Sequence, residues 1–531
     1  MTTKALLTAP HEPEDLVIKT EEYAYGHIIE ALTHGLYPDK LHVIREYVQN
    51  AYDAVLAARL RAPEAYRGRV RIKTATPSVF IYDDGIGMDR SKIDQYRYVG
   101  YSEKRTGEGV GFRGIGKLAG LSVAEKLIVT SSPQGVSERY QLVFDANAML
   151  EHLVTLKSEG HNIPLNRLIG THTSVTVAPE RPETHYTMVE LHCVRDDSLQ
   201  LLEEESLQVY LSMNAPVDFD PLSKYGSQVD KWLREHVRDY DTVDLRLNGK
   251  RVFKPILEDL APPQLEFIWP SPDEAEGMDD EECEESRPLA FCWYCEHAKK
   301  GQLPDKLRRG LFYRLKNFAI GDNQLTRTTL WHSAPERAFY FSGEIHVMDP
   351  EVLPSSSRDE FEQNAARERL YECGALLSKT LNRIAGRSSD ERRAVHYIER
   401  AEDVVSDIFE ELQTGGVPEE LVFDKKFAVR TAAQDVQKRL RKAPEEMEDR
   451  GQQVIEAAGE MIRRLDSRSE ETETYVYDIR ESLDLGPEAS HIYTIVIECL
   501  RKELATDTAM YERLVRAIHA ALSNQGEGSS Q

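Results

Sequence analysis

The order of apolar and polar positions predicts different kinds of structure in successive parts of the chain. Residues 14–60 carry apolar side chains at helical spacing, and Pro38-Asp39 divides this stretch into two helices. Between residues 70 and 177, short β-rich runs alternate with glycine loops and helices; the runs are Val70–Ile72, Val79–Tyr82, Lys126–Thr130 and Ser174–Val177. This mixture favours an α+β sandwich over a regular parallel sheet.

A second α+β region is predicted after the acidic positions Asp196-Asp197 and Glu203–Glu205, which suggest a boundary near residue 205. Its strand-like segments are Val243–Leu247, Phe291–Cys295, Leu311–Arg314 and Gly343–Val347. The nearly all-acidic stretch Asp273–Glu285 interrupts this region, and we expect a solvated loop there.

Beyond about residue 386 the chain is predicted to be α-helical and highly charged. Apolar side chains recur at steps of three and four from Val429 to Leu465, as in a coiled-coil seam. Pro444 lies inside this seam, so two packed helices or a kinked one are expected. We therefore divide the chain into residues 1–205, 206–385 and 386–531. The last six residues, Gly526–Gln531, are expected to be disordered.

Bulk properties exclude several classes of function. A chain of 531 residues is long enough for several domains. Its net charge of −25 repels phosphate backbones, so general nucleic-acid binding is not expected without a local basic patch. There is no apolar run of membrane-span length and no signal-peptide core, and six cysteines are too few for a disulfide framework. We therefore expect a soluble cytoplasmic protein without membrane contacts.

Two polar segments predict a nucleotide site. Glu46, Asn50 and Asp53 are spaced by four and three residues, so they share one face of a helix. The turn Asp83–Gly87 follows a strand, and its glycines permit close approach of a ligand to the backbone. A polar helix face opposite an acidic strand end and a glycine turn can bind a purine nucleotide without a Walker lysine.

The residue types in these segments suit ATP chemistry. The amide oxygen of Asn50 suits Mg²⁺, a hard cation that needs few protein ligands. Glu46 lies one helical turn earlier and is placed to polarise a water toward the γ-phosphate. Asp83 can accept a hydrogen bond from an exocyclic amine, which selects adenine over guanine.

A glycine-rich run adds a candidate phosphate-binding lid. Residues 107–117 hold five glycines before a helical stretch, and bare backbone amides at a helix start suit a triphosphate. Each motif alone is typical of a solvated helix face or an ordinary turn. Their order along the chain, followed by Gly170-Thr171 opening a strand, favours a nucleotide-driven protein.

These four elements resemble the N, G1, G2 and G3 boxes of the GHKL ATPases, and the opening helices are similar to those of the ninety-kilodalton heat-shock chaperones. The resemblance implies a Bergerat-fold α/β sandwich in which Glu46 activates water and Asn50 binds Mg²⁺. Asp83 and Thr171 would hold adenine, and the Gly109–Gly116 backbone would hold the phosphates. The candidate ATP-binding residues are Asn50, Asp53, Asp83, Gly85, Gly87, Met88, Gly109, Gly111, Phe112, Arg113, Gly114, Ile115, Gly116, Lys117 and Thr171.

The resemblance continues into the second region. Leu311–Asp322 and Gly343–Phe361 look like the chaperone middle domain, which implies a ribosomal S5 domain 2-like α+β fold. Arg358 matches the arginine that reaches the γ-phosphate when the domains close, a second catalytic candidate. The alternative for Arg358 is a surface ion pair with Asp359 or Glu360. The lid segment is nearer to MutL-like or other divergent GHKL proteins than to the chaperone's pattern, and residues 386–531 show no convincing match to the chaperone's dimerisation domain.

Two cysteines allow an alternative reading as a zinc site. Cys292 and Cys295 have Cys283 and His297 nearby in the sequence. If residues 291–295 form a strand, however, the two thiols point to opposite faces. Buried free thiols are therefore the expectation.

Together these features predict a Mg²⁺-dependent, slowly ATP-hydrolysing conformational clamp, similar to Hsp90 and chaperone-like. Its partners would be a second copy of the chain, held by the helical C-terminal region, and a protein client or partner complex. The alternative is an ATP-gated scaffold or subunit of a bacterial defence or DNA-maintenance complex, as in MORC-like and MutL-like relatives. A histidine kinase or a topoisomerase is not favoured, because we find no phosphoacceptor-histidine helix, nucleophilic-tyrosine region or basic DNA track.

Overall fold

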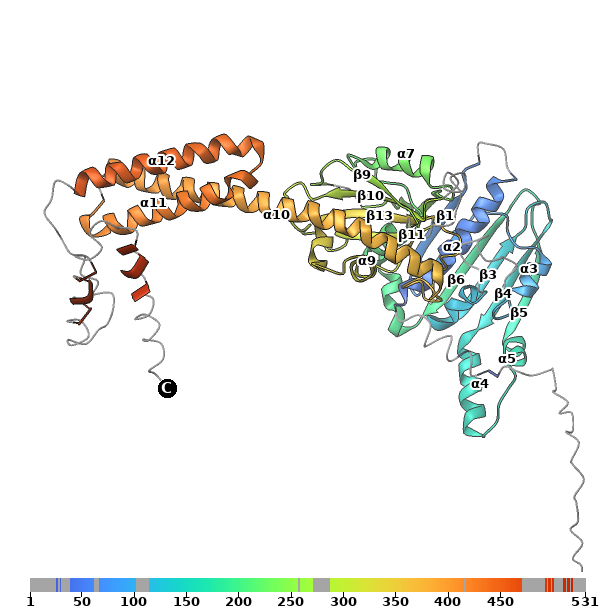
Figure 1. Cartoon of the computed structure of the whole chain (residues 1–531). Helices are drawn as coiled ribbons and strands as arrows, with labels where there is room; N and C mark the ends of the chain where they lie inside the picture. Colours follow the sequence, from blue (N-terminus) through green and yellow to red (C-terminus); the bar gives the residue numbers. More distant parts are fainter. Residues whose placement is uncertain are drawn as a thin grey trace, which may run out of the picture. The chain divides into compact units, whose positions relative to one another are not determined.

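The computed structural model describes most of the chain as two compact units, residues 1–389 and residues 390–531, which are considered separately (Figure 1). The described residues are 25, 26, 29, 39–61, 66–101, 114–255, 258–270, 287–414 and 417–469, with scattered positions between 492 and 518. Most of the helix expected before Pro38 lies outside the described residues, as do the acidic stretch Asp273–Glu285 and the tail Gly526–Gln531.

An eight-stranded sheet forms the centre of the first part of the chain. Its strand order is β5-β4-β3-β6-β2-β1-β7-β8, and all neighbours are antiparallel except β1 and β7. The four strands expected between residues 70 and 177 are present. The strands are β1 (Arg69–Ala75), β2 (Ser78–Asp83), β3 (Ala124–Ser132), β4 (Glu138–Asp145), β5 (Thr173–Pro179), β6 (Tyr186–Val194), β7 (Asp244–Leu247) and β8 (Lys250–Arg251).

Helix α2 (Leu41–Arg59) packs on β1, β2 and the 3₁₀ helix η1 (Gly116–Ser122). Its fully buried residues Ile44, Val48 and Val55 recur at helical spacing and join the apolar core of the sheet. The remaining elements around this sheet are α3 (Arg90–Gln95), α4 (Ala146–Ser158), α5 (Leu165–Thr171), η2 (Asp196–Leu202) and α6 (Glu204–Asn214). The buried residues of α7 (Gly226–His236) pack instead with Phe291 and Trp293 of the second sheet. The core thus fixes α2 against the strand that ends at Asp83.

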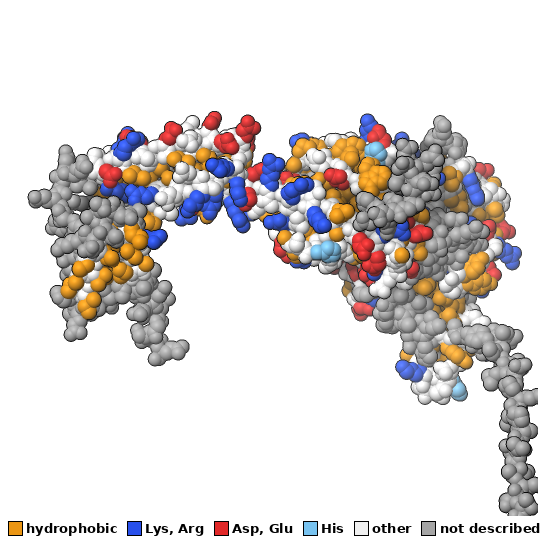
Figure 2. Space-filling view, in the orientation of Figure 1, with side chains coloured by type: hydrophobic (Ala, Val, Ile, Leu, Met, Phe, Trp, Pro, Cys, Tyr) orange, Lys and Arg blue, Asp and Glu red, His pale blue; other side chains and the backbone are white. Residues whose placement is uncertain are grey.

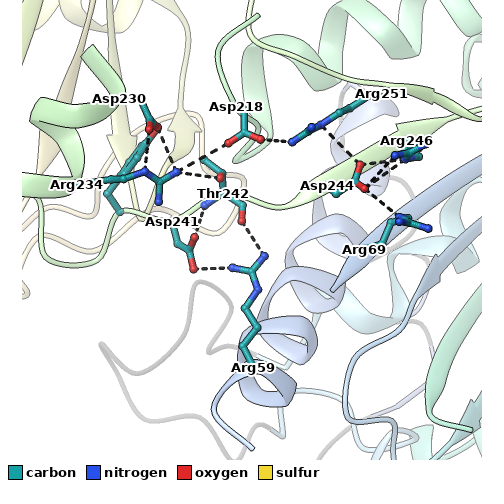
Figure 3. A network of polar contacts seen from close by, with 11 residues as sticks. Arg59, Arg69, Asp218, Asp230, Arg234, Asp241, Thr242, Asp244, Arg246 and Arg251 are labelled. Atoms are coloured by element: carbon teal, nitrogen blue, oxygen red, sulfur yellow. Dashed lines mark hydrogen bonds and ion pairs between the residues drawn. The ribbon is translucent and has the colours of Figure 1, made fainter. Parts of the chain in front are cut away.

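The first sheet takes two strands from beyond the boundary expected at residue 205. Strand β7 pairs in parallel with β1, and its residues Leu245 and Leu247 are fully buried. A chain of ion pairs lies over this junction (Figure 3), including Arg69 with Asp244 at 3.0 Å and Arg59 with Asp241 at 2.7 Å. Since such half-exposed pairs contribute at most about 1 kcal/mol each, burial of the β7 leucines matters more. The 205 boundary therefore does not separate the two sheets.

A second, five-stranded sheet follows, with the order β12-β11-β13-β10-β9. Its strands are β9 (Gln264–Ile268), β10 (Ala290–Glu296), β11 (Gly310–Leu315), β12 (Phe318–Ile320) and β13 (Phe341–Val347), and it carries α9 (Asn323–Leu330) and η4 (Pro335–Tyr340). Three of these strands, β10, β11 and β13, were expected from the sequence. The mixed α+β class is therefore confirmed for the second region.

A fully buried charge cluster holds this second sheet together. The carboxylate of Glu344 on β13 accepts hydrogen bonds from Lys254 Nζ at 2.8 Å, from Arg314 Nε at 2.8 Å and from Trp293 Nε1 at 3.2 Å. Burial by itself would raise the pKa of Glu344, but Arg314 and Lys254 outweigh it and hold that pKa well below its usual range. Glu344 is therefore ionised and serves as the shared counter-charge of the two buried cations Lys254 and Arg314.

The unit of residues 390–531 is helical in its described part. Helix α10 (Ala365–Thr414) spans the boundary between the units, and α11 (Glu419–Arg439), η5 (Leu440–Lys442) and α12 (Glu445–Ser469) follow. The break expected at Pro444 is confirmed, and the seam residues Val429, Ala458 and Met461 pack in one apolar cluster. Figure 2 shows Lys and Arg side chains gathered along α10 and α11. Among the described helices, none is long and apolar enough to cross a membrane.

Replacing Glu344 by glutamine tests the buried cluster. Lys254 and Arg314 are 3% and 2% exposed and would lose their shared counter-charge. Removing one partner of a buried pair costs about 3–5 kcal/mol, so we expect the unfolding midpoint of this region to fall by roughly 10 °C. Thermal unfolding followed by circular dichroism measures the change. The matched control is Glu351→Gln at an exposed position, and equal midpoints for the two variants would contradict a stabilising role for the cluster.

Candidate functional site

The turn after β2 is fastened to helix α2 by close backbone contacts. Ile86 N–H donates to the carbonyl oxygen of Ala54 at 3.2 Å. A Cβ on Gly85 would lie 2.6 Å from Ala54 Cβ, and one on Gly87 would lie 2.0 Å from the carbonyl oxygen of Ser132. Gly87 also has a φ of +68°. Only glycine fits at these two positions, which explains the glycines of the motif.

Asp83 presents a buried carboxylate at the end of β2. The side chain is 5% exposed, and its Oδ1 accepts a hydrogen bond from Gly85 N–H at 2.9 Å. Burial raises the pKa of Asp83 to about 8, with the nearby Asp84 adding to the rise, while the backbone amides of Gly85 and Thr187 act in the opposite direction. Such a costly group in a turn is typical of a functional position.

Sequence reasoning missed three polar residues that surround Asp83. Thr187 on β6 is the direct cross-strand partner of Asp83, and its hydroxyl lies 3.0 Å from Ser131 Oγ on β3. Ser131 Oγ also accepts a hydrogen bond from Met88 N–H at 2.8 Å, and His185 Nδ1 lies 2.7 Å from the carbonyl oxygen of Gly85. Met88 itself is half-buried against the core. The apolar–polar alternation of residues 186–194 was the signal that could have located Thr187.

Thr171 does not lie beside Asp83, and the expectation that it opens a strand is wrong. It is the last residue of α5, it is exposed, and its hydroxyl donates to the carbonyl oxygen of Arg167 at 2.9 Å. The next strand, β5, is the outer strand of the sheet, separated from β2 by three other strands. The threonine opposite Asp83 is Thr187, because β6 and not β5 pairs with β2.

Glu46 lies between the two sheets in contact with Arg358. Its carboxylate is 10% exposed, and Oε1 lies 3.1 Å from Nε of Arg358. A Cβ on Gly116 would lie 2.0 Å from Oε2, so this glycine makes room for the carboxylate where η1 begins. The two predicted catalytic residues, from segments more than 300 positions apart, are thus brought together.

The loop that carries Arg358 is held in a strained conformation. Arg358 has a φ of +59°, which is uncommon for a residue other than glycine. Its carbonyl oxygen accepts a hydrogen bond from Gly321 N–H at 2.9 Å, and Arg45 Nη2 on α2 donates to the carbonyl oxygen of Ser357 at 2.6 Å. Since Arg358 is 5% exposed and contacts Glu46, the alternative of an exposed surface pair with Asp359 or Glu360 is wrong.

Lys117, at the C-terminal end of the predicted lid, contacts the residues that precede the lid. Lys117 Nζ donates to the carbonyl oxygens of Gln95 at 3.1 Å and Tyr101 at 2.9 Å, and burial lowers the pKa of Lys117 to about 8. A Cβ on Gly114 would lie 2.2 Å from the same Tyr101 oxygen. Ile115 begins η1 as its N-cap. The other lid candidates, Gly109, Gly111, Phe112 and Arg113, lie outside the described residues.

Asn50 and Asp53 occupy the exposed side of α2. Asn50 is exposed one turn after Glu46, and Asp53 is half-buried. The described residues contain no group of three or more His, Cys, Asp or Glu side chains that could hold a metal. An exposed amide oxygen one turn from a buried carboxylate fits Mg²⁺ carried by a nucleotide, since this ion keeps waters and takes few protein ligands.

The cysteines of β10 do not form a metal site within the described part of the chain. Cys292 and Cys295 are buried free thiols, and burial raises the pKa of both. Cys283 lies outside the described residues. Protonated buried thiols are poor metal ligands, so the expectation of buried free thiols is confirmed for Cys292 and Cys295.

Substituting Asp83 by asparagine should reveal the cost of its burial. The pKa of Asp83 rises from 3.8 to about 8 on folding, so its favourable contribution is full below pH 4 and is lost as pH rises through 8. Asp83→Asn should therefore gain in unfolding temperature relative to the natural protein between pH 5 and 8.5. Differential scanning fluorimetry measures this, with Asp94→Asn at an exposed site as control. A difference that does not change with pH would contradict the assignment.

The comparisons with known proteins agree with this geometry. Residues 41–168 match the family model of histidine kinase-, DNA gyrase B- and HSP90-like ATPases. This range includes α2, the Asp83 turn and Gly116, the elements that surround Glu46 and Asp83. The matched range therefore contains these elements, whereas Thr187 and Arg358 lie outside it.

Curated relatives point to the same group. The chain is 26% identical over 164 residues to the chaperone protein HtpG of Pasteurella multocida, covering 26% of each chain. It is 29% identical over 156 residues to HtpG of Sulfurovum sp., covering 25% of each. The matches thus span about a quarter of the length of these relatives. This chain therefore contains a GHKL-type ATPase domain and is distantly similar to HtpG chaperones of the Hsp90 family.

Proposed function

We propose that the first unit binds ATP together with Mg²⁺ and hydrolyses it slowly, and that the nucleotide controls the contact between the two sheets. The observation that carries this proposal is the 3.1 Å contact between Glu46 on α2 and Arg358 in the loop after β13. It joins the candidate base to the candidate phosphate-binding cation. The ATPase domain type supports the nucleotide, and the similarity to HtpG supports a clamp of the Hsp90 kind.

The surroundings of Asp83 favour adenine. The carboxylate can accept a hydrogen bond from the exocyclic amine of adenine. Thr187 lies on the adjoining strand β6, and Ser131, whose hydroxyl contacts that of Thr187, lies on β3 beyond it. Guanine presents a carbonyl oxygen where adenine has this amine, so two acceptors would face each other when Asp83 is ionised, and the hydrogen bond from the adenine amine favours that ionised form. An unpaired buried polar group costs about 1–3 kcal/mol, enough for clear selectivity between the two bases.

The phosphate end of the site would lie between Asn50, Gly116 and Glu46. Bound Mg²⁺ would neutralise phosphate charge, with Asn50 as its protein ligand. Glu46 would orient the attacking water and accept its proton. The guanidinium of Arg358 would leave Glu46 for a γ-phosphate oxygen, which carries more negative charge. ATP would then shift the two sheets relative to each other, because its affinity differs between the two arrangements.

A specific observation also favours slow turnover. One carboxylate oxygen of Glu46 contacts Arg358, and the other lies against the Gly116 backbone. A base held in this way is unavailable to water until Arg358 moves. This supports the second candidate function, an ATP-gated scaffold that binds nucleotide as a conformational signal for a partner complex. In either function the helical unit is the proposed site of dimerisation or partner binding.

Replacing Thr187 and Thr171 separately by valine tests which of the two contacts adenine. We expect Thr187→Val to weaken ATP binding by about tenfold, because one hydrogen bond and the Ser131 contact are lost. Thr171→Val serves as the matched control and should leave the dissociation constant within about twofold, since its hydroxyl is bonded to Arg167. Calorimetric titration measures both. Weaker ATP binding by Thr171→Val and unchanged binding by Thr187→Val would instead support Thr171 as the residue that contacts adenine.

Kinetics of Glu46 and Arg358 variants test hydrolysis. Glu46→Gln should lower single-turnover hydrolysis by about 10²-fold or more while changing the ATP dissociation constant by less than about threefold. Arg358→Ala should lower turnover by roughly 10³-fold, and Arg383→Ala at an exposed position is the matched control. Unchanged turnover in Glu46→Gln would exclude this base.

The same single-turnover measurement separates the two candidate functions. Stoichiometric ATP binding with no hydrolysis by the natural protein would favour the ATP-gated scaffold. Hydrolysis that depends on Glu46 would favour the ATPase clamp.

A further inference from the structure

A crevice with a volume of about 790 Å³ lies between α6 and the second sheet, apart from the nucleotide site. One wall is formed by α6 and by Leu41 at the start of α2, and the other by β11, β12 and the start of α9. Neither Asp83 nor Glu46 lines it. The volume falls in the range of about 300–1,000 Å³ that is typical of small-molecule sites.

The rim of the crevice is negatively charged. Glu203, Glu205 and Asp322 line it, and Lys306 is the one cation in the described lining. The remaining carboxylate, Glu204, is already paired with Lys250 at 2.8 Å. Three carboxylates facing one ammonium group favour a positively charged ligand.

The interior of the crevice is apolar and aromatic. Val209 and Leu307 line it although they are 37% and 50% exposed, and Met213 and Phe312 complete the surface. Tyr210 is 9% exposed, and its hydroxyl has no hydrogen-bond partner among the described residues. The aromatic rings of Tyr210 and Phe312 can receive an ammonium group.

We propose that this crevice is a binding site for a small organic cation with an apolar body. The carboxylates of the rim and the rings of Tyr210 and Phe312 would hold the charged head. The side chains of Val209, Met213 and Leu307 would cover the apolar body, which removes their exposed surface from water. Binding at this site does not rest on the proposed ATPase function.

The crevice shares its wall with the loop that carries Arg358. Gly321 lines the crevice, and its N–H donates to the carbonyl oxygen of Arg358 at 2.9 Å. The ring of Tyr210 lies 6.0 Å from that of His42, whose Nδ1 is 3.7 Å from the Asp359 carboxylate. A ligand that contacts Tyr210 and Gly321 would therefore restrict the movement of the loop that carries Arg358. We expect such a ligand to change the rate of ATP turnover.

Binding is tested on the full chain without nucleotide, using n-octylammonium as the probe. Octanoate and 1-octanol are the probes of equal length with negative and zero charge. The charge variant is Glu203→Gln with Glu205→Gln, at exposed positions where folding is not at risk. Glu159→Gln with Glu183→Gln removes the same charge from exposed positions outside the crevice and controls for general attraction to a chain of net charge −25. Val209→Trp fills the crevice.

We expect n-octylammonium to bind with one site per chain and at least about tenfold more tightly than octanoate. The Glu203/Glu205 variant should weaken it by about three- to tenfold, the Glu159/Glu183 variant should not, and Val209→Trp should abolish it. No saturable binding, equal binding of octanoate, or equal weakening in both double variants would overturn the proposal.

A second readout tests the coupling to Arg358. Saturating n-octylammonium should change ATP turnover in the natural protein and leave the turnover of Val209→Trp, which does not bind the probe, unchanged at the same concentration. Binding without any change in turnover would overturn the coupling while leaving the site. A chain that binds the probe but hydrolyses no ATP at all would contradict the ATPase proposal alone.

Discussion

The buried ion pair between Glu46 and Arg358 joins the two sheets of the first unit, and the arrangement of the whole site depends on it. Glu46 belongs to α2, which the core fixes against the strand ending at Asp83. Arg358 belongs to a strained loop that Gly321 and Arg45 hold in place. A charge pair in this position is weak evidence for stability, because desolvation opposes it. Under the proposed function, Arg358 exchanges this pair for a phosphate.

Several energetically unfavourable features lie near the Glu46–Arg358 pair and the Asp83 turn. The carboxylate of Asp83 is buried against its preference for water, Arg358 has left-handed backbone geometry, and Gly85 and Gly116 leave room that any side chain would fill. Such costs persist where the surrounding fold enforces them. Here the enforcement comes from the core of the first sheet and from the hydrogen bonds of Gly321 and Arg45 to the loop that carries Arg358.

Much of the site could be predicted from the sequence because its motifs are local. Glu46 and Asn50 follow from helical spacing, and Asp83 follows from a strand that runs into a glycine turn. Thr171 was misplaced because which strand lies beside β2 is a matter of topology. The sheet order places β6 there, so Thr187 and not Thr171 lies opposite Asp83. Likewise the parallel pairing of β7 with β1 and the contact of Arg358 with Glu46 join segments far apart in sequence, which no local pattern records.

Calorimetric titration of the intact chain with ATP and with GTP, each with Mg²⁺, tests the central claim most directly. The claim is that the first unit encloses an adenine nucleotide between α2, the Asp83 turn and η1. It predicts saturable uptake of about one ATP per chain and binding of GTP at least about tenfold weaker. The absence of ATP uptake by a folded preparation, or equal affinity for both nucleotides, would contradict it.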